Sequence, residues 1–307
     1  MKFAVVGGGA TGLRAARQLG ATAGTEAEVV TRDQVVPSGV DAVILCTPAS
    51  QADLAEGFLR EGIPVVTTTD DRSDVQRCFE LGTLAANHDV PIIIGAGFAP
   101  GLTDLLARFA ASRLQQVDEI HVAKHGTGGP ACARQHHQAL ASAGQVWRDG
   151  RWLPRVGGSG RELCWFPDPV GALDCYNGDL ADARLLLESF QGAQRVSARM
   201  SATRRDRMTS RLPMLRKPHP EGGIGAIRVE VRGIRDGERI SIVFGAIDRP
   251  AIAAGTVAAV AALHLAAPRA FTGPVVLGDE RIDTLALLKD LAERGVRAAE
   301  FAGQGNA

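Results

Sequence analysis

Residues 2–12 read KFAVVGGGATG. An apolar strand over 2–6 leads into the spacing G-x-G-x-x-G, and a helix is expected over 11–20. In this motif the first glycine permits a tight turn, the second lets the backbone approach a pyrophosphate, and the third lets the helix pack closely on the strand. The amides at the helix start then face the phosphates. The segment predicts a dinucleotide site whose residues are Gly7, Gly9, Ala10, Thr11 and Gly12.

Short apolar segments alternate with amphipathic ones through the first third of the chain. Each apolar segment is brief and rich in β-branched residues, which is typical of strands buried on both faces of a parallel sheet. The expected strands are 2–6, 27–31, 42–46, 64–68 and 91–95, and the expected helices are 11–20, 51–61, 72–88 and 102–114. Parallel strands need crossover helices between them. Residues 1–116 are therefore predicted to form a doubly wound Rossmann domain of the α/β class.

The pattern changes at about residue 117, where apolar and polar residues begin to alternate as in a sheet with one covered face. The expected strands are 118–125, 161–166, 195–202, 226–234 and 238–245, with a helix at 179–190. Asp236-Gly237 joins the last two strands and is a strong hairpin signal, because both residues tolerate positive φ. Residues 117–249 are predicted to form an inserted α+β substrate domain with a largely antiparallel sheet.

The last part of the chain is predicted to be helical. Helices are expected over 250–267 and 282–294, so that 250–307 returns to the Rossmann domain as C-terminal helices. Two crossings between the domains follow from this order of segments. A cleft is expected where the domains meet.

The end of the second strand bears on the choice of cofactor. It runs into Thr31 and Arg32, a hydroxyl and a guanidinium. NAD-binding chains tend to place here a carboxylate that would repel a 2′-phosphate, whereas arginine offers a planar donor fork for phosphate. Asp33 lies about 20 residues beyond Gly12, at the spacing of that carboxylate, so NAD remains the alternative. The pattern favours NADP, bound through Thr31 and Arg32.

Three further residues are expected to border the cofactor. Cys46, Thr47 and Pro48 follow the third strand of the predicted parallel sheet. Ligands of open α/β sheets bind outside the carboxyl ends of the strands. For Cys46 we expect the packing of a small apolar residue and no thiol chemistry.

Residues 95–106, GAGFAPGLTDLL, resemble the G-F-x-P-G-L element of the saccharopine dehydrogenase-like oxidoreductases. A looser similarity continues through 125–130, 166–171 and 228–233, so it covers most of the chain. The resemblance implies hydride transfer at C–N bonds of amino acids with a nicotinamide cofactor, and a homodimer. Glycines in the element leave room for a flat ring, and the proline suits a first helical turn. The residues implied to lie at the nicotinamide are Gly97, Phe98, Pro100 and Gly101.

Two features of this sequence differ from members of that family. Ala99 stands where many of them have aspartate, and the second domain is shorter than in saccharopine reductase. A substrate other than saccharopine is therefore expected, either another amino acid or an imino or oxo acid.

Hydride transfer also needs a group that supplies or removes a proton. The strand 118–125 ends in Lys124 and His125, whose side chains lie on opposite faces of a strand. His125 is the first choice for proton transfer because histidine titrates near neutral pH, and Lys124 is the second. Each residue could instead have a structural role: His125 could be hydrogen-bonded to a backbone carbonyl, and Lys124 could form a salt bridge.

Composition excludes several classes of partner. Lys and Arg number 34, as do Asp and Glu, so the formal charge is zero and no global field would attract nucleic acid or an anionic membrane. The five cysteines are scattered without a CxxC pair, which indicates reduced thiols and a cytoplasmic protein. His136 and His137 diverge on a helix, and no metal site is expected there.

Three functions remain open from the sequence. The first is an NADP(H)-dependent dehydrogenase or reductase of amino acids or their imines. The second is a redox sensor or regulatory protein that binds NADP(H) without turnover. The third is a different Rossmann reductase, acting on a sugar or a cyclic imine, because a fold alone does not determine the substrate.

Overall fold

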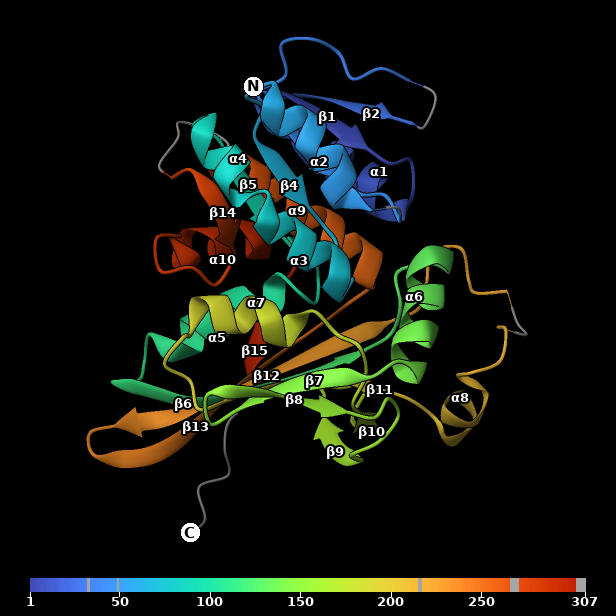
Figure 1. Ribbon diagram of the computed structural model, residues 1–307, viewed down its shortest axis with the longest axis vertical. Helices are drawn as coiled ribbons and strands as arrows, with labels where there is room; N and C mark the ends of the chain where they lie inside the picture. The colour runs from blue at the N-terminus through green and yellow to red at the C-terminus, as the bar shows by residue number, and fades with distance from the viewer. Residues whose placement is uncertain (32–33, 49, 215–216, 266–270, 302–307) are drawn as a thin grey trace.

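A computed structural model describes residues 1–31, 34–48, 50–214, 217–265 and 271–301. Two sheets make up the molecule, with helices packed around the first and between the two (Figure 1). The predicted fold class, a Rossmann domain with a second α+β domain, is confirmed.

The first sheet has six strands, and all of its pairs are parallel. Its strands are β1 (Lys2–Val6), β2 (Glu26–Val30), β3 (Ala42–Leu45), β4 (Val65–Thr67), β5 (Pro91–Ile94) and β14 (Gly273–Val276), in the order β14-β5-β4-β3-β1-β2. Successive residues of one strand enter different core clusters: Val43 and Leu45 lie in one, and Ile44 lies in the other. Both faces are therefore buried, as the unbroken apolar strands predicted. The chain reverses direction across the sheet at β1, which places the ligand crevice beyond β1 and β3.

Helices cover both faces of this sheet. They are α1 (Ala10–Gly20), α2 (Gln51–Arg60), α3 (Arg72–Glu80), α4 (Gly82–Asn87), α9 (Pro250–Leu265) and α10 (Thr284–Glu293). The single helix predicted over 72–88 is wrong, because the helix breaks at Leu81 into α3 and α4. At the break, a Cβ on Gly82 would lie 3.0 Å from the ring of Pro274. The glycine thus lets α4 pack closely against β14, the edge strand of the sheet.

The second sheet has nine strands and is antiparallel except for the pair β6 and β11. Its strands are β6 (Gln116–His125), β7 (Gly144–Arg148), β8 (Arg151–Arg155), β9 (Glu162–Trp165), β10 (Ala172–Tyr176), β11 (Arg195–Ser201), β12 (Gly225–Arg235), β13 (Glu238–Asp248) and β15 (Ala298–Glu300). Asp236 and Gly237 have positive φ in the predicted hairpin between β12 and β13. The same dipeptide at 149–150 closes the hairpin of β7 and β8, which the sequence reading had not assigned.

Helices α5 and α7 lie between the second sheet and the Rossmann domain (Figure 1). The remaining helices are α5 (Leu102–Ala111), α6 (Pro130–Ala141), α7 (Asp182–Ser189) and α8 (Arg204–Thr209). On β6, Ile120, Val122 and Lys124 are buried on the face that these helices cover. His121 projects from the other face and bonds Ser197. The face of β6 that carries Lys124 is therefore the one turned toward the Rossmann domain.

The prediction of an all-helical C-terminal segment over 250–307 is wrong in one respect, because the segment also supplies two strands. β14 pairs with β5 in the first sheet, and β15 pairs with β13 in the second. Both are edge strands of three or four residues, too short for a clear pattern. Within the described ranges, no helix combines the length and the apolar character needed to cross a membrane.

Close contact between α1 and α9 depends on a buried glycine. A Cβ on Gly255 would lie 2.3 Å from the carbonyl oxygen of Thr11. We expect Gly255→Ala to lower the free energy of unfolding by about 1–3 kcal/mol, because the helices must separate to admit the methyl group. Urea unfolding followed by circular dichroism measures the change.

Gly57 provides the matched control, because it is exposed in α2 and has no atom within 4 Å of the added Cβ among the described residues. Gly57→Ala should raise the free energy of unfolding by roughly 0.5–1 kcal/mol through helix propensity alone. Equal stabilisation by both substitutions would contradict the close approach of α1 and α9.

Candidate functional site

The glycine turn between β1 and α1 has the shape that the motif predicted. Gly7 has φ +127°, and a Cβ there would lie 2.6 Å from the carbonyl oxygen of Cys46. A Cβ on Gly12 would lie 1.9 Å from the carbonyl oxygen of Gly7. No side chain of the described residues caps the start of α1, and its first turn carries no acid. The helix start is thus left open for an anion, as at a pyrophosphate site.

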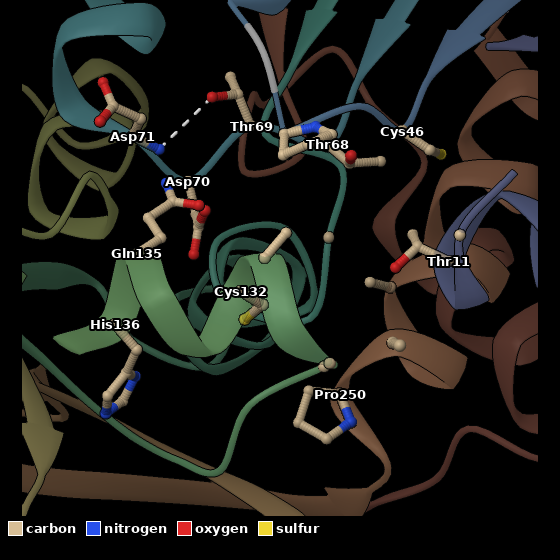
Figure 2. A pocket seen from close by; sticks show the side chains of 18 of the residues that line it. Thr11, Cys46, Thr68, Thr69, Asp70, Asp71, Cys132, Gln135, His136 and Pro250 are labelled. Atoms are coloured by element: carbon tan, nitrogen blue, oxygen red, sulfur yellow. Dashed lines mark hydrogen bonds between the residues drawn. The ribbon is translucent and has the colours of Figure 1, made fainter. Parts of the chain in front are cut away.

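One cleft of about 850 Å³ joins this turn to the second domain. The predicted residues that line it are Gly7, Gly9, Ala10, Thr11, Cys46, Thr47, Pro48, Gly97, Phe98, Pro100, Lys124 and His125. Figure 2 shows Thr11 and Cys46 on the side of the Rossmann domain, across from α6. Burial raises the pKa of the Cys46 thiol to about 12, so it is protonated at neutral pH. That is in keeping with the expectation of packing over thiol chemistry.

The other predicted cofactor residues do not line the cleft. Gly12 and Gly101 lie behind the cleft surface, where each packs closely on the backbone of a residue that lines it, Gly7 and Gly97 respectively. Thr31 is exposed at the end of β2, where its hydroxyl donates to the side chain of Gln34 at 2.9 Å. Arg32 and Asp33 lie outside the described residues, so their roles in cofactor choice stay predictions.

The loop over 97–101 is folded tightly on itself. The amide of Gly97 donates to the carbonyl oxygen of Pro100 at 3.0 Å. Gly101 has φ +114°, and a Cβ there would lie 2.4 Å from the backbone of Gly97. Only glycine fits at this position, so the loop presents a rigid floor to the cleft.

A buried carboxyl group holds the end of this loop. Asp104 is 1% exposed, and its Oδ2 accepts from the amide of Gly101 at 2.8 Å. Its Oδ1 has no partner among the described residues. Burial raises the pKa of Asp104 from 3.8 to about 7, against the bond from Gly101. The group therefore titrates near neutral pH directly beneath the loop.

Lys124 fixes the same loop from the second domain. Its Nζ donates to the carbonyl oxygen of Ala99 at 3.1 Å and lies 3.4 Å from Asp182 and 3.7 Å from Asp70. Burial opposes the charged ammonium, but the two carboxylates outweigh it and raise the pKa of Lys124. Lys124 is therefore protonated at neutral pH, beside the loop where the resemblance implies the nicotinamide.

His125, which the sequence predicted as the first candidate for proton transfer, lies in different surroundings from Lys124. It borders the cleft, but its Nδ1 is 2.7 Å from the hydroxyl of Ser201 and its ring lies 6.2 Å from that of Phe166. These partners belong to the face of the second sheet opposite Lys124. Burial lowers the pKa of His125, so its imidazole is neutral at pH 7. The structure thus separates the two predicted residues and places only the Lys124 side chain among the acids of the cleft.

The sequence did not predict the acids around Lys124, nor the α6 residues that line one side of the cleft. Asp70 follows β4, so the rule that ligands bind at the carboxyl ends of strands could have found it. Asp182 begins α7 and meets Lys124 only through tertiary folding, so no local signal marks it. Cys132, Gln135 and His136 form one face of α6 at the spacing i, i+3, i+4, and they line the cleft (Figure 2).

His136 and His137 point to different partners, as expected for neighbours on a helix. His136 lines the cleft, whereas Nε2 of His137 lies 2.9 Å from the carbonyl oxygen of Leu212. Among the described residues no group of three or more His, Cys, Asp or Glu side chains could hold a metal ion.

Known structures share this fold over nearly the whole chain. Saccharopine dehydrogenase (L-Glu forming) from Saccharomyces cerevisiae matches with a TM-score of 0.72 at 13% identity, covering 98% of this chain and 100% of that one. A mutant meso-DAP dehydrogenase from Clostridium tetani matches with a TM-score of 0.54 at 14% identity, over 93% and 95% of the two chains. The fold is that of saccharopine dehydrogenase and related Rossmann-type dehydrogenases, as the resemblance implied.

Sequence similarity to characterised proteins covers less of the chain. A myo-inositol dehydrogenase from Streptomyces leeuwenhoekii is 31% identical over 160 residues, which are 48% of this chain and 46% of the relative. The match therefore spans about half of either protein. No family model matches the chain.

The position of Asp104 makes stability depend on pH. Its native pKa of about 7 exceeds the unfolded value, so the native state binds more protons than the unfolded state between about pH 4 and 7. The free energy of unfolding of the wild type then falls as pH rises through this window, by up to about 4 kcal/mol for this group. Asp104→Asn cannot titrate and should gain stability relative to the wild type by that amount between pH 4 and 7.

Urea unfolding at a series of pH values gives the difference between the two proteins. Asp149→Asn, which removes an exposed hairpin carboxylate, is the control and should show a difference that stays within about 0.5 kcal/mol. Parallel pH profiles for Asp104→Asn and the wild type would show that Asp104 is ionised in the native state.

Proposed function

We propose that the chain is an NADP(H)-dependent oxidoreductase that transfers hydride at a carbon–nitrogen centre, an amine or its imine, or at a related oxo acid. The observation that carries the proposal is a single cleft with a glycine turn at one end and a buried lysine between carboxylates at the other. The first feature suits a dinucleotide pyrophosphate, and the second suits proton transfer beside a reacting carbon.

The cofactor is assigned from the residues of the Rossmann side. The open start of α1 takes the pyrophosphate, Cys46, Thr47 and Pro48 border the ribose and nicotinamide, and the loop 97–101 supports the ring. Thr31 with Arg32 favours NADP over NAD through the 2′-phosphate. When bound, the nicotinamide supplies or accepts the hydride, and the protein aligns the substrate with it.

Lys124 is the proposed proton donor in the direction of reduction. Its ammonium stays charged between Asp70 and Asp182, and the cleft leaves it close to the loop that supports the nicotinamide ring. Reduction of a C=N or C=O bond leaves an electron pair on nitrogen or oxygen, which needs a proton.

The relatives support two substrate classes. The names of saccharopine dehydrogenase and meso-DAP dehydrogenase favour an amino acid or its imine. The sequence match to a myo-inositol dehydrogenase favours a second candidate, a reductase of a sugar or cyclitol. Lys124 would serve either, since both reactions add a proton to the heteroatom.

Calorimetry with NADPH and NADH tests the cofactor assignment. We expect NADPH to bind more tightly, and Arg32→Ala to weaken NADPH by about 10- to 100-fold through loss of a charge-assisted phosphate contact. The same substitution should leave the affinity for NADH within a few fold. No affinity for either nucleotide would overturn the proposal, and a preference for NADH would remove the 2′-phosphate contact alone.

Lys124→Met tests the proton donor. We expect kcat for NADPH oxidation with a carbonyl substrate and ammonium to fall by about 100-fold or more, with the Kd for NADPH nearly unchanged. His125→Gln, which can still bond Ser201, should lose much less. If His125→Gln is the more damaging change, then histidine is the donor.

The substitution also leaves Asp182 buried without its cation, so Lys124→Met alone is expected to lower the melting temperature. The double variant Lys124→Met with Asp182→Asn removes both charges. It should recover part of the stability and none of the activity. Recovered activity would show that Lys124 has only a structural role.

A further inference from the structure

The charges around Lys124 do not balance. One ammonium lies within 4 Å of two carboxylates, Asp182 and Asp70. The Asp182 side chain is 0% exposed and belongs to the protein interior, whereas that of Asp70 is 29% exposed and faces the cleft (Figure 2). At 3.7 Å the Asp70 carboxylate is beyond hydrogen-bond distance from Lys124. The surplus negative charge is therefore on the cleft side and available to a ligand.

The part of α6 that faces Asp70 is polar and uncharged. The α6 side chains Cys132, Gln135 and His136 line the cleft; Gln135 extends toward Asp70, whereas the ring of His136 points away from it (Figure 2). Burial lowers the pKa of His136 to about 4 and raises that of Cys132 to about 11. At neutral pH this face thus offers an amide, a neutral imidazole and a thiol. Such groups donate to and accept from hydroxyls.

The other cations that line the cleft are not placed to hold a buried carboxylate. Arg77 is engaged by Asp53 and by the hydroxyl of Ser50 at 2.9 Å. Arg134 is exposed on α6. Among the described residues, Lys124 is the buried cation of the cleft, and its charge is already met by two acids. A substrate carboxylate beside it would add a third negative charge at high cost.

We infer that the substrate is a small hydroxylated amine without a carboxylate, whose ammonium or iminium nitrogen lies against Asp70 and whose hydroxyls contact Gln135. The inference rests on the proposed function and names the substrate class of the same site. A cationic nitrogen supplies the charge that the cluster of Lys124, Asp70 and Asp182 lacks. Hydroxyls match the uncharged wall of α6.

The reaction balances in the direction of reductive amination. A ketone and ammonium condense to an iminium ion with loss of water. NADPH, when bound, would supply the hydride that converts this iminium ion to the amine and would leave as NADP. One further proton, supplied through Lys124, makes the product an ammonium ion. In reverse, the ammonium form loses one proton and one hydride to give the iminium ion.

Dihydroxyacetone and hydroxypyruvate form a matched pair of probes, because they differ only in a hydroxymethyl group and a carboxylate. With ammonium in excess, NADPH oxidation is followed by absorbance for each. We expect kcat/KM for dihydroxyacetone to exceed that for hydroxypyruvate by at least tenfold. Calorimetry on the enzyme saturated with NADP should likewise show tighter binding of serinol than of serine.

Two variants separate the alternatives. Asp70→Asn should weaken serinol binding by tenfold or more and reduce the preference over serine, with the affinity for NADP unchanged. Arg134→Gln should leave the preference as it is. A preference for hydroxypyruvate and serine that is lost in Arg134→Gln would overturn the inference and identify a carboxylate site at the mouth of the cleft.

Failure of the inference and failure of the proposed function give different results. If NADP binds but neither serinol nor serine does, the amine site is wrong and the cofactor assignment stands. If neither nucleotide binds, the proposed function itself fails. Turnover of dihydroxyacetone at a rate independent of ammonium would instead favour a carbonyl reductase and would also overturn the amine site.

Discussion

The structure depends on the absence of side chains where four backbone segments meet. Gly7 and Gly12 bring β1, α1 and the end of β3 within distances that no Cβ would allow, and Gly255 does the same for α9 against α1. These contacts fix where α1 begins and in which direction its free amides point. Since a pyrophosphate would bind there, they also determine where the rest of a dinucleotide would run. The loop 97–101, itself closed by Gly101, lies along the same cleft.

The second domain is tied to that loop by charged groups. Lys124 reaches from β6 to the carbonyl oxygen of Ala99, and Asp182 on α7 holds Lys124. From the Rossmann side, Asp104 holds the amide of Gly101. Groups from both domains thus hold this one short loop, which couples their relative position to the geometry of the cleft. A shift of either domain would move the proposed proton donor away from the cofactor.

The features that the sequence predicted are those with local causes. Apolar strands of the parallel sheet, the glycine turn and the hairpin at Asp236 each depend on residues that are neighbours in the chain. Lys124 and the two acids around it come from three segments far apart in sequence, so no single motif could reveal the whole cluster. At the break between α3 and α4, Gly82 packs against Pro274, almost two hundred residues away, and the edge strands β14 and β15 are defined by their partners. Sequence alone predicted most of the parallel sheet and the glycine turn, but not the side chains that gather around Lys124 or on α6.

The cluster of Lys124, Asp70 and Asp182 is better explained by function than by stability. A buried ion pair contributes little net stability, because desolvation of both charges offsets their attraction. Here the cost is greater, since a second carboxylate shares the same ammonium and Asp182 keeps an oxygen without a partner among the described residues. Replacement of such a cluster by apolar residues would be expected to cost nothing or to stabilise the fold. An arrangement with one charge in excess, open to a cleft on one side only, is instead what a site requires when its ligand brings the missing charge.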